Sequence, residues 1–332
     1  PVIRRLIIVP QDSRINIRTT VAKETDFSIS NPVIPAIPPV EKNGAKPVYK
    51  LNKKAYSKDG FIIDEKEIVR ISHLGRIRGK NIGILELFPV NYNPASGILR
   101  LYETVKVEIR FEEPVEPRRK GLSSPVFDEL LNREVLNPLE VSPHPAYPVE
   151  YLIITADEFF DRIQEFARWK TQKGYKVDIY RISEVGTDDE AIKSFVEEAY
   201  SSWEIAPTYL LLVGDVEQIP SHNTGRHLSD KYFVTVDGDD YVPDIIVGRF
   251  SAQTEEQLNA IIEKTLVYER YSFINESWLT HPVFLACGTD GDWELAEGTH
   301  RYVFTEYLHP PEFHPDSLWA YDGATTSDVI TA

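Results

Sequence analysis

Residues 209–215 read YLLLVGD, five apolar or aromatic residues that run directly into a glycine and an aspartate. A similar run, YLIIT, occupies residues 151–155, and charged stretches with apolar residues at helical spacing lie between the two. Short apolar strands that alternate with amphipathic helices are typical of a mainly parallel sheet with helices on both faces. The sequence from residue 151 onward therefore predicts an α/β fold.

The rest of this region repeats the same alternation. The stretch Thr187-Asp188-Asp189-Glu190 has the pattern of a capping box and predicts the start of a helix. Gly174 follows a run with one apolar face and predicts the end of another helix. Helices are expected at 157–173, 187–203, 254–271 and 293–308, and further strands at 176–182, 244–250 and 283–287.

Residues 1–113 have a different pattern. Short runs in which apolar and polar residues alternate are separated by turn signals such as Asn93-Pro94-Ala95-Ser96-Gly97. A period of two residues indicates half-buried strands, and a series of such strands is typical of a sandwich. We predict an all-β, sandwich-like domain here, with strands at 2–9, 14–20, 61–63, 68–74, 80–90 and 97–111.

Seven prolines punctuate residues 114–150, which we interpret as a connector with one short helix near 127–136. The chain therefore divides into a β-rich part at 1–113, a Pro-rich connector at 114–150 and an α/β part at 151–332. The basic run Arg118-Arg119-Lys120 in the connector has two readings. It is either solvated linker charge or a processing site for a protease that cuts after basic residues.

The charge is divided unevenly along the chain. Residues 1–120 hold 22 basic and 14 acidic residues, a net of +8, whereas residues 121–332 hold 14 and 38, a net of −24. Opposite net charges attract over a Debye length of about 8–10 Å. The division indicates either two domains with different surfaces or a basic front domain docked on an acidic partner. So acidic a chain argues against nucleic-acid binding, and no apolar stretch reaches the length of a membrane span.

Four carboxylates lie within the eight residues 237–244, DGDDYVPD. Like charges this close repel unless they are solvated or neutralised. Calcium takes six to eight oxygens from carboxylates and carbonyls, and such a loop can supply them. The loop is not an EF-hand, because no glutamate stands at the twelfth position. A calcium site and a solvated acidic turn both remain open.

A nucleophile is not evident from the residues alone. Cys287 is the single cysteine and lies in the apolar run FLACG, where a cysteine is most often a small core residue rather than a reactive group. The eight histidines show no metal-ligand spacing, and no nucleophile and base can be paired. The sequence contains no G-x-G-x-x-G and no P-loop, so nucleotide binding has no support.

Several blocks in series resemble the catalytic domain of the gingipain family of cysteine peptidases. Residues 68–113, with the motifs GRIRG at 75–79 and LFPV at 87–90, also resemble the prodomain side of related bacterial members, with weaker specificity. The catalytic-domain blocks are YLLLVGD at 209–215, Ile219-Pro220, Ser229-Asp230, Asp240, VGRFS at 247–251, Lys264-Thr265 and Tyr268-Glu269-Arg270.

The resemblance implies a caspase-like α/β fold, a Cys/His dyad, bound calcium, export to the outside or the cell surface, and cleavage of proteins or peptides after basic residues. The family's catalytic His lies in a Gly-His-Gly segment beyond a Tyr-Asp turn, which corresponds here to Tyr321-Asp322. The 332 residues contain no Gly-His-Gly, and Cys287 does not match the nucleophile. We therefore expect a zymogen fragment that is inactive as given. The alternative is a non-catalytic, calcium-stabilised adhesion or scaffold module.

The resemblance also implies site residues. The specificity acid, which would pair with an Arg or Lys of the substrate, matches Glu297 if His300 is the anchor, and Asp290, Asp292 or Glu294 could take that role instead. A solvated helix-face glutamate is the simpler reading of Glu297. The implied calcium ligands are Asp230, the Asp237 carbonyl, Asp240, the Val242 carbonyl and Asp244.

Overall fold

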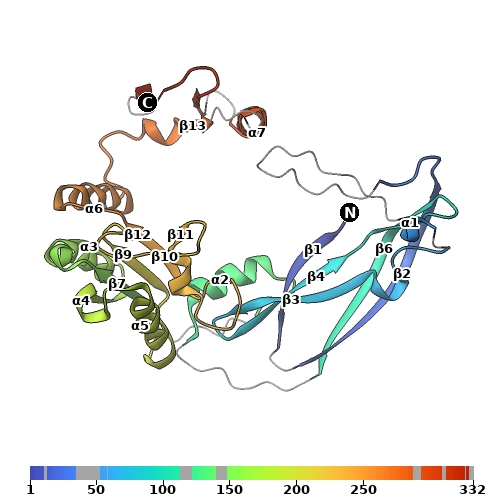
Figure 1. Cartoon of the computed structure of the whole chain (residues 1–332), viewed down its shortest axis with the longest axis horizontal. Helices are drawn as coiled ribbons and strands as arrows, with labels where there is room; N and C mark the ends of the chain where they lie inside the picture. The colour runs from blue at the N-terminus through green and yellow to red at the C-terminus, as the bar shows by residue number, and fades with distance from the viewer. Residues whose placement is uncertain are drawn as a thin grey trace. The chain divides into compact units, whose positions relative to one another are not determined.

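The structure is a computed structural model that describes residues 1–10, 13–34, 53–57, 59–112, 122–139, 148–286, 293–308, 312–325 and 327–328. It divides into two compact units, Pro1–Ile261 and Ile262–Ala332. The first unit contains the β-rich front domain and a four-stranded parallel sheet (Figure 1).

The front domain (residues 1–113) is built from two three-stranded antiparallel sheets, which confirms the predicted β-rich start. Each sheet has its central strand paired on both sides, and the pairings β1–β4 and β2–β6 join strands that lie far apart in the sequence. One sheet has the order β1-β4-β3, with β1 Ile3–Val9, β4 Lys80–Leu87 and β3 Val69–Ile77; the other has the order β2-β6-β5, with β2 Arg14–Ser28, β6 Ile98–Glu112 and β5 Val90–Asn93. The short helices are α1 Lys53–Tyr56 and the 3₁₀ turn Glu65–Glu67.

Residues from both sheets share one core. Ile68, Val69 and Tyr102 are buried there, with Leu85 of β4 and Val105 of β6 packed against them. Alternate residues of each strand turn inward, as the period of two predicted. The two sheets therefore form the expected sandwich-like layer pair.

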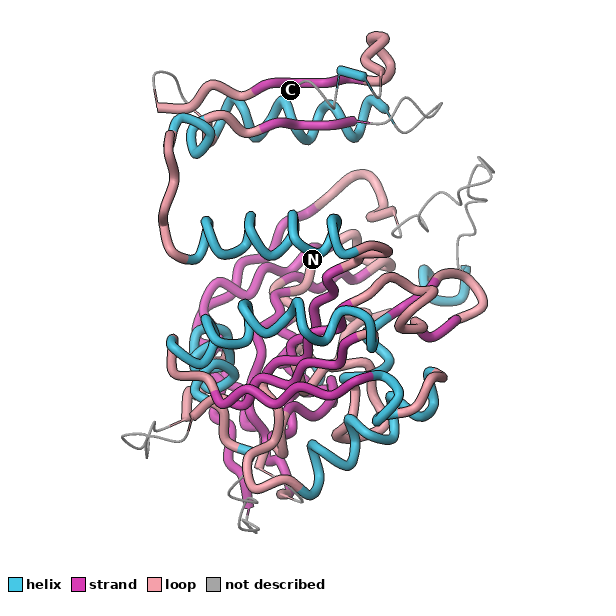
Figure 2. Tube along the Cα trace, turned by 90° about the vertical axis from the view of Figure 1, so that its left-hand side faces the viewer, coloured by secondary structure: helices cyan, strands magenta, loops and turns pink. Residues whose placement is uncertain are grey.

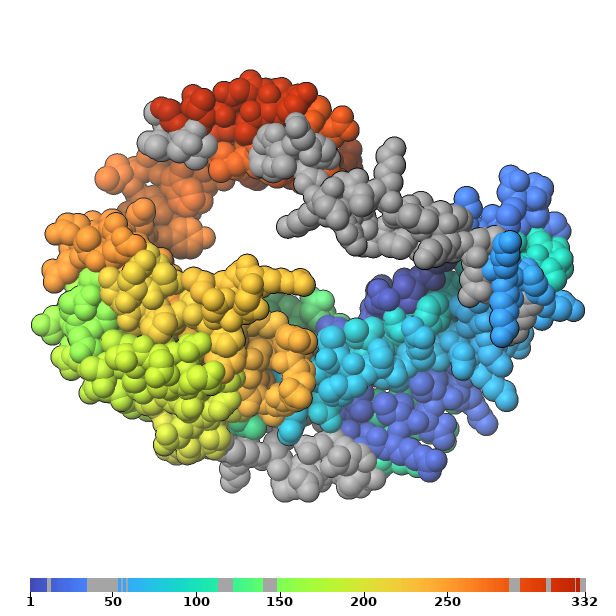
Figure 3. Space-filling view, viewed as in Figure 1, coloured from blue at the N-terminus to red at the C-terminus, as the bar shows by residue number. Residues whose placement is uncertain are grey.

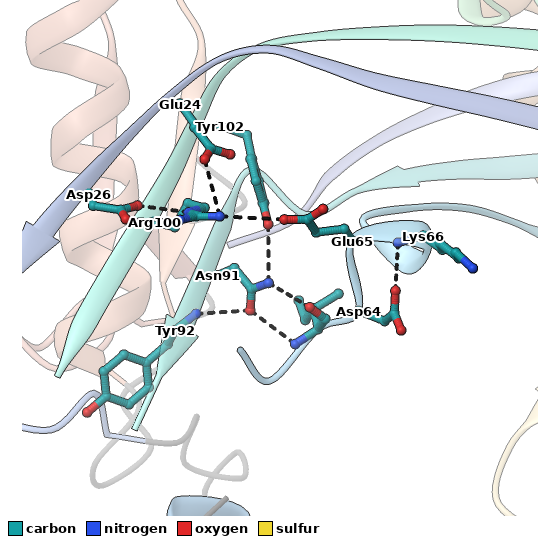
Figure 4. A network of polar contacts seen from close by, with 10 residues as sticks. Glu24, Asp26, Asp64, Glu65, Lys66, Asn91, Tyr92, Arg100 and Tyr102 are labelled. Carbon is teal, nitrogen blue, oxygen red and sulfur yellow. Dashed lines mark hydrogen bonds and ion pairs between the residues drawn. The ribbon is translucent and has the colours of Figure 1, made fainter. Parts of the chain in front are cut away.

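The predicted strand at 61–63 does not form. Asn91 takes the place of a strand partner, because its side chain accepts the Ile63 N–H at 3.0 Å and donates to the Ile63 carbonyl at 2.7 Å. The same amide nitrogen donates to the Tyr102 hydroxyl at 3.3 Å (Figure 4). A buried asparagine thus satisfies an irregular backbone segment that the alternating pattern could not distinguish from a strand.

Arg100 lies beside this network and joins β6 to β2. Its guanidinium pairs with Asp26 at 2.8 Å, Glu24 at 3.2 Å and Glu65 at 3.5 Å (Figure 4). These pairs are largely exposed, so each contributes little to stability. On one face of the long β2–β6 pair, however, they link the two strands to each other.

The second part of the first unit contains the predicted α/β layer. Its sheet has the order β12-β9-β7-β8 and every pairing is parallel, as the apolar runs predicted. The strands are β7 Glu150–Thr155, β8 Lys176–Arg181, β9 Tyr209–Val213 and β12 Ile246–Phe250. The helices are α3 Phe160–Gln172, α4 Ile182–Val185, α5 Asp189–Ser202 and α6 Glu255–Glu269, and the minor elements are β10 His222–Asn223, β11 Leu228–Ser229 and the 3₁₀ turns Asp157–Phe159 and Asp230–Val234.

Helices cover both faces of this sheet (Figure 2). Leu152 of β7 belongs to a buried cluster with Ile192 and Val196 of α5. The adjacent Tyr151 points the other way, and its ring lies 6.2 Å from that of Phe166 in α3. Neighbouring residues of one strand therefore pack under different helix layers, which explains why the whole strand is apolar.

The start of α5 differs by one residue from the prediction. Asp188 is the N-cap, and its Oδ1 accepts the Ala191 N–H at 2.8 Å, so Thr187 is not the capping residue. The carboxylate satisfies one free amide of the first turn and is stabilised by the positive end of the helix dipole.

The described part of the connector, 122–139, is packed rather than loose. Leu131 and Val135, in and just after α2 (Pro125–Glu134), share a buried cluster with Ile8 of β1. Asn137 holds the Ile8 backbone from both sides, accepting its N–H at 2.9 Å and donating to its carbonyl at 2.8 Å. The proposed boundaries at 113 and 150 remain a prediction.

The second unit begins within α6 and contains, in its described residues, a parallel strand pair and one further helix (Figure 2). The Phe284 and Phe304 rings lie 4.5 Å apart and join strand to helix. The elements are β13 Val283–Ala286, α7 Trp293–Glu306 and β14 Asp316–Trp319, preceded by the 3₁₀ turn Ser277–Thr280. Within the described ranges, none of the helices has the length and apolar character that a bilayer crossing requires.

Candidate functional site: the acidic loop and the hairpin tip

The acidic loop (residues 237–244) ends at Asp244, immediately before β12 begins. This side chain is completely buried, and its Oδ2 accepts the backbone N–H groups of Val236 at 3.0 Å and Asp237 at 2.8 Å. Burial raises the pKa of Asp244 to about 6, although these backbone donors act in the opposite direction. The Asp244 side chain therefore holds the end of the acidic loop against its start.

A second partner of the acidic loop comes from the front domain. The hairpin tip (residues 75–79) joins β3 to β4 and lies against the loop, cyan beside yellow-orange in Figure 3. Three backbone N–H groups of the hairpin tip each donate to a different carboxylate of the loop: Arg76 to Asp240 Oδ2 at 2.8 Å, Arg78 to Asp244 Oδ1 at 2.9 Å and Gly79 to Asp237 Oδ2 at 2.6 Å.

The Arg78 side chain reaches further into the α/β part and is 1% exposed. Its guanidinium stands between the rings of Phe127 and Tyr200, at 5.3 and 5.7 Å from their centroids. Burial lowers the pKa of Arg78, although the nearby Tyr200 and Asp244 act in the opposite direction. Four carbonyls accept from it: Leu122 at 2.8 Å, Pro207 at 2.7 Å, Asp244 at 3.1 Å and Ala206 at 3.2 Å.

Asp230, the first predicted calcium ligand, has a different partner. Its two carboxylate oxygens accept from Arg249 of β12 at 2.8 and 2.7 Å, and one also accepts from the Ser221 hydroxyl. Arg249 donates in addition to the Gly214 and Ile219 carbonyls, at 2.9 and 2.8 Å. The fork of Arg249 thus ties together the loops at the carboxyl edge of the sheet.

These contacts bear on the expected calcium ion. The carboxylates of Asp230, Asp237, Asp240 and Asp244 all accept hydrogen bonds from protein donors, and one of those donors is a guanidinium. In the described ranges they do not gather around a common point, since the group of acidic, His or Cys side chains close enough to share an ion is a different one. In this conformation the predicted ligands, with the Val242 carbonyl, do not fit calcium, and the ion stays a prediction.

That other group is Asp189, Glu190 and His222, whose ligand atoms all lie within 4.8 Å of one another. His222 Nδ1 lies 2.7 Å from Asp189 Oδ2, and the His222 ring stacks on Tyr232 at 3.8 Å. The Tyr232 hydroxyl donates to Glu190 at 3.0 Å. Sequence spacing gave no sign of this cluster, because β10 brings His222 to the first turn of α5 from 33 residues away.

Asp215 follows β9, where the sequence placed an acid at the sheet edge. It accepts from the Ser251 hydroxyl at 2.7 Å and from the Gln253 amide at 2.9 Å. The hydrogen bond from Ser251, together with those from the Val216 backbone and Gln253, holds the pKa of Asp215 below its usual range. Asp215 thus links the ends of β9 and β12.

Glu297 lies on α7 in the second unit and is buried, with 4% exposure. One oxygen accepts from Arg301 at 3.3 Å, while Oε1 has no hydrogen-bond partner. Burial of a carboxylate oxygen without a donor is costly, so this atom is free to accept one. Of the alternatives, Glu294 is exposed, and Asp290 and Asp292 lie outside the described residues, as do Cys287 and the basic run 118–120.

Known proteins resemble this chain over nearly its whole length. Lys-gingipain HG66 of Porphyromonas gingivalis is 28% identical over 347 aligned residues, covering 98% of the chain and 20% of that protein. Gingipain R1 of the same species is 28% identical over 294 residues, covering 84% of the chain and 29% of that protein. The chain thus spans about a fifth to a third of the length of these curated relatives.

Two solved structures are similar in part. One is the Arg-specific cysteine proteinase gingipain R, with a TM-score of 0.49 at 25% identity, covering 58% of this chain and 45% of the other. The second is a complex of the RgpB pro- and mature domains of Porphyromonas gingivalis, with a TM-score of 0.47 at 25% identity, covering 55% and 44%.

Family models match both halves of the chain. The model Propeptide_C25 matches residues 1–137, which comprise the front domain and α2. The model of peptidase family C25 matches residues 144–330, more than half of the chain. With its propeptide region followed by the start of the peptidase region, the chain belongs to peptidase family C25.

Proposed function

We propose that this chain is the front part of a secreted or surface-exposed cysteine endopeptidase zymogen that cleaves proteins or peptides after basic residues. The order of the two family regions supports this, since a propeptide region precedes a peptidase region. The names of the relatives, Lys-gingipain and gingipain R, supply the basic-residue preference that we extend to this chain.

The observation that carries the proposal is the burial of Arg78 in the α/β part. A surface contact between domains commonly opens and closes, whereas Arg78 is enclosed, with four carbonyl acceptors and two aromatic rings. Removing it leaves those buried acceptors without donors. The front domain therefore acts as a tightly held cover, the role of a prodomain that keeps a peptidase latent.

Glu297 is the residue we propose for recognising the basic side chain of the substrate. A buried carboxylate with one free oxygen can accept charge-assisted hydrogen bonds from a lysine ammonium or an arginine guanidinium. The pairing with Arg301 at 3.3 Å is long, and Arg301 itself is more than half exposed. A substrate cation could displace it at little cost.

The test uses a protein in which this chain is followed by the family's catalytic His and Cys segments. Wild-type zymogen should hydrolyse a fluorogenic Lys or Arg peptide slowly, and Arg78→Ala should raise that initial rate by about tenfold or more. Arg226→Ala, at an exposed arginine in the same unit, is the matched control. If Arg78→Ala stays as latent as wild type although hydrogen exchange shows that its front domain has undocked, the front domain does not confer latency.

A further inference from the structure

Two histidines, His281 and His314, lie side by side where the parallel pair β13–β14 begins. The backbone ladder extends to both of them, because the His314 N–H donates to the Thr280 carbonyl at 2.7 Å and the Asp316 N–H donates to the Pro282 carbonyl at 2.9 Å. The two side chains are therefore cross-strand neighbours, and their ring centroids lie 5.3 Å apart.

The histidine pair lies on the face of the two strands that α7 does not cover. Phe284 packs against Phe304 of α7, so the alternate residues Val283 and Leu285 point away from the helix and are 43% and 51% exposed. His281 belongs to this alternate set, and both histidines are exposed. A dissolved ion can therefore reach both rings from the solvent.

The protonation of the His281 ring is fixed by a backbone carbonyl. Its Nδ1 hydrogen bonds to the Ser277 carbonyl, which can only accept, so Nδ1 carries the proton and Nε2 of the neutral ring presents a lone pair. The Thr280 hydroxyl donates to the same carbonyl at 3.0 Å and does not compete for that proton. Histidines that bind metals usually donate their second ring N–H to a carbonyl or carboxylate in this way.

The His314 ring is free to complete such a site. Among the described residues, this ring has no hydrogen-bond partner. Both histidines precede a proline, Pro282 or Pro315, which restricts the backbone before it to extended conformations. Two imidazoles on one tetrahedral zinc ion, at Zn–N distances of about 2.0–2.1 Å, have ring centroids about 5 Å apart. The observed separation is therefore already that of two ligands of one ion.

We propose that His281 and His314 bind one divalent transition-metal ion of the zinc type, which links the start of β13 to the start of β14. Imidazole nitrogen suits zinc, copper and nickel, whereas calcium and magnesium take oxygen ligands. Asp316 is exposed two residues beyond His314 on the same strand face, where its negative charge attracts a cation. Water completes the coordination. The site has no part in the proposed peptidase chemistry, and its ligands differ from those expected for calcium.

The test is calorimetric titration of the whole 332-residue chain with ZnCl₂. It is made on a His222→Gln background, because His222 lies with Asp189 and Glu190 in a separate cluster that could also take zinc. This chain should bind zinc, and adding His281→Gln and His314→Gln should remove one bound zinc per chain. His227→Gln, at an exposed histidine between β10 and β11, is the matched control and should remove none. Excess calcium should not displace the zinc.

A second measurement needs no substitution at the pair. Zinc should slow hydrogen exchange at the His314 amide of the wild-type chain, because the ion holds the strand joint closed, and should leave Ile82 in β4 unchanged. Equal zinc binding with and without the two histidines overturns the site, as do displacement of the zinc by calcium and unchanged exchange at His314. Absence of zinc binding on the His222→Gln background overturns it as well. These readouts are independent of peptidase activity.

Discussion

The backbone N–H of Arg78 donates to Asp244 Oδ1 at 2.9 Å, across 166 positions of sequence. The same arginine donates through its guanidinium to the Asp244 carbonyl at 3.1 Å. Arg78 of the front domain thus contacts both the side chain and the backbone carbonyl of Asp244, which lies beside the parallel sheet. The contact joins a region matched by the propeptide model to a region matched by the peptidase model.

Replacing this arginine should destabilise the chain strongly. Arg78→Ala leaves four buried carbonyls without their donor and opens a space between two aromatic rings, so the free energy of unfolding should fall by about 3 kcal/mol. Arg226→Ala, on an exposed loop, should change it by less than about 0.5 kcal/mol. Urea unfolding followed by tryptophan fluorescence measures both. Equal stability of the two variants would mean that the buried position of Arg78 is not the one populated in solution.

The planar shape of the Arg249 guanidinium should contribute to stability in addition to its charge. Its fork serves Asp230, Ser221 and two carbonyls, and a lysine ammonium cannot reach all of them. Arg249→Lys should therefore lower the free energy of unfolding by about 2 kcal/mol, whereas Arg226→Lys should have almost no effect. Thermal unfolding in excess EDTA is the measurement, since the predicted loss does not depend on calcium. Full stability of Arg249→Lys would refute the network's role.

Glu150 gives the chain a pH-dependent stability. It is fully buried at the start of β7, and burial raises its pKa to about 7, despite the hydrogen bond from Lys176 at 2.8 Å. A carboxyl whose folded pKa exceeds the unfolded value of 4.5 contributes stability that is complete below about pH 4.5 and lost as pH rises through about 7. The loss should be on the order of 3 kcal/mol at most.

The check is the difference in unfolding free energy between wild type and Glu150→Gln from pH 4.5 to 8. Wild type should lose stability relative to the variant as pH rises, because glutamine does not ionise. Glu158→Gln, at an exposed glutamate nearby, should run parallel to wild type across the range. A constant difference between wild type and Glu150→Gln would show that Glu150 titrates normally.

Glu297 should govern substrate preference in a protein that carries the catalytic His and Cys. Glu297→Gln should lower kcat/KM for Lys and Arg peptides by about 30-fold or more, because a buried charge loses its partner. Glu294→Gln, exposed on the same helix, is the control and should keep full activity. If Glu294→Gln is the impaired variant instead, the recognition of basic side chains belongs to Glu294.

The strands of the parallel sheet could be predicted because burial on both faces leaves an unbroken apolar signature, as in Leu210, Leu211 and Leu212 of β9. The front-domain strands followed from alternation, except at residues 61–63 and at 80–90, which the structure divides between β4 (Lys80–Leu87) and β5 (Val90–Asn93). At 61–63, Asn91 replaces the strand pairing through its side chain, which no local pattern reveals. The charge asymmetry left docking of the two parts as one of two readings and did not indicate where they meet.

The acidic loop shows that amino-acid composition alone does not predict the partners of a carboxylate. Four carboxylates in eight residues indicated a need for positive partners, and the resemblance to gingipains suggested calcium. In the structure, backbone amides and the Arg76 guanidinium of residues 75–79 contact the loop, and Arg249 contacts the neighbouring Asp230. Which group binds a carboxylate depends on contacts about 160 residues away along the chain, as between the Arg76 backbone N–H and Asp240, and residue spacing cannot encode them.

The most direct measurement is hydrogen exchange at the Arg78 and Gly79 amides of the intact chain in EDTA. In a two-residue hairpin turn these N–H groups have no partner within the hairpin and exchange at nearly free rates. Docking on Asp244 and Asp237 should instead protect them to about the level of Ile82, deep in β4. Free exchange at both amides, with β4 still protected, would contradict a front domain held on the peptidase region by its hairpin tip.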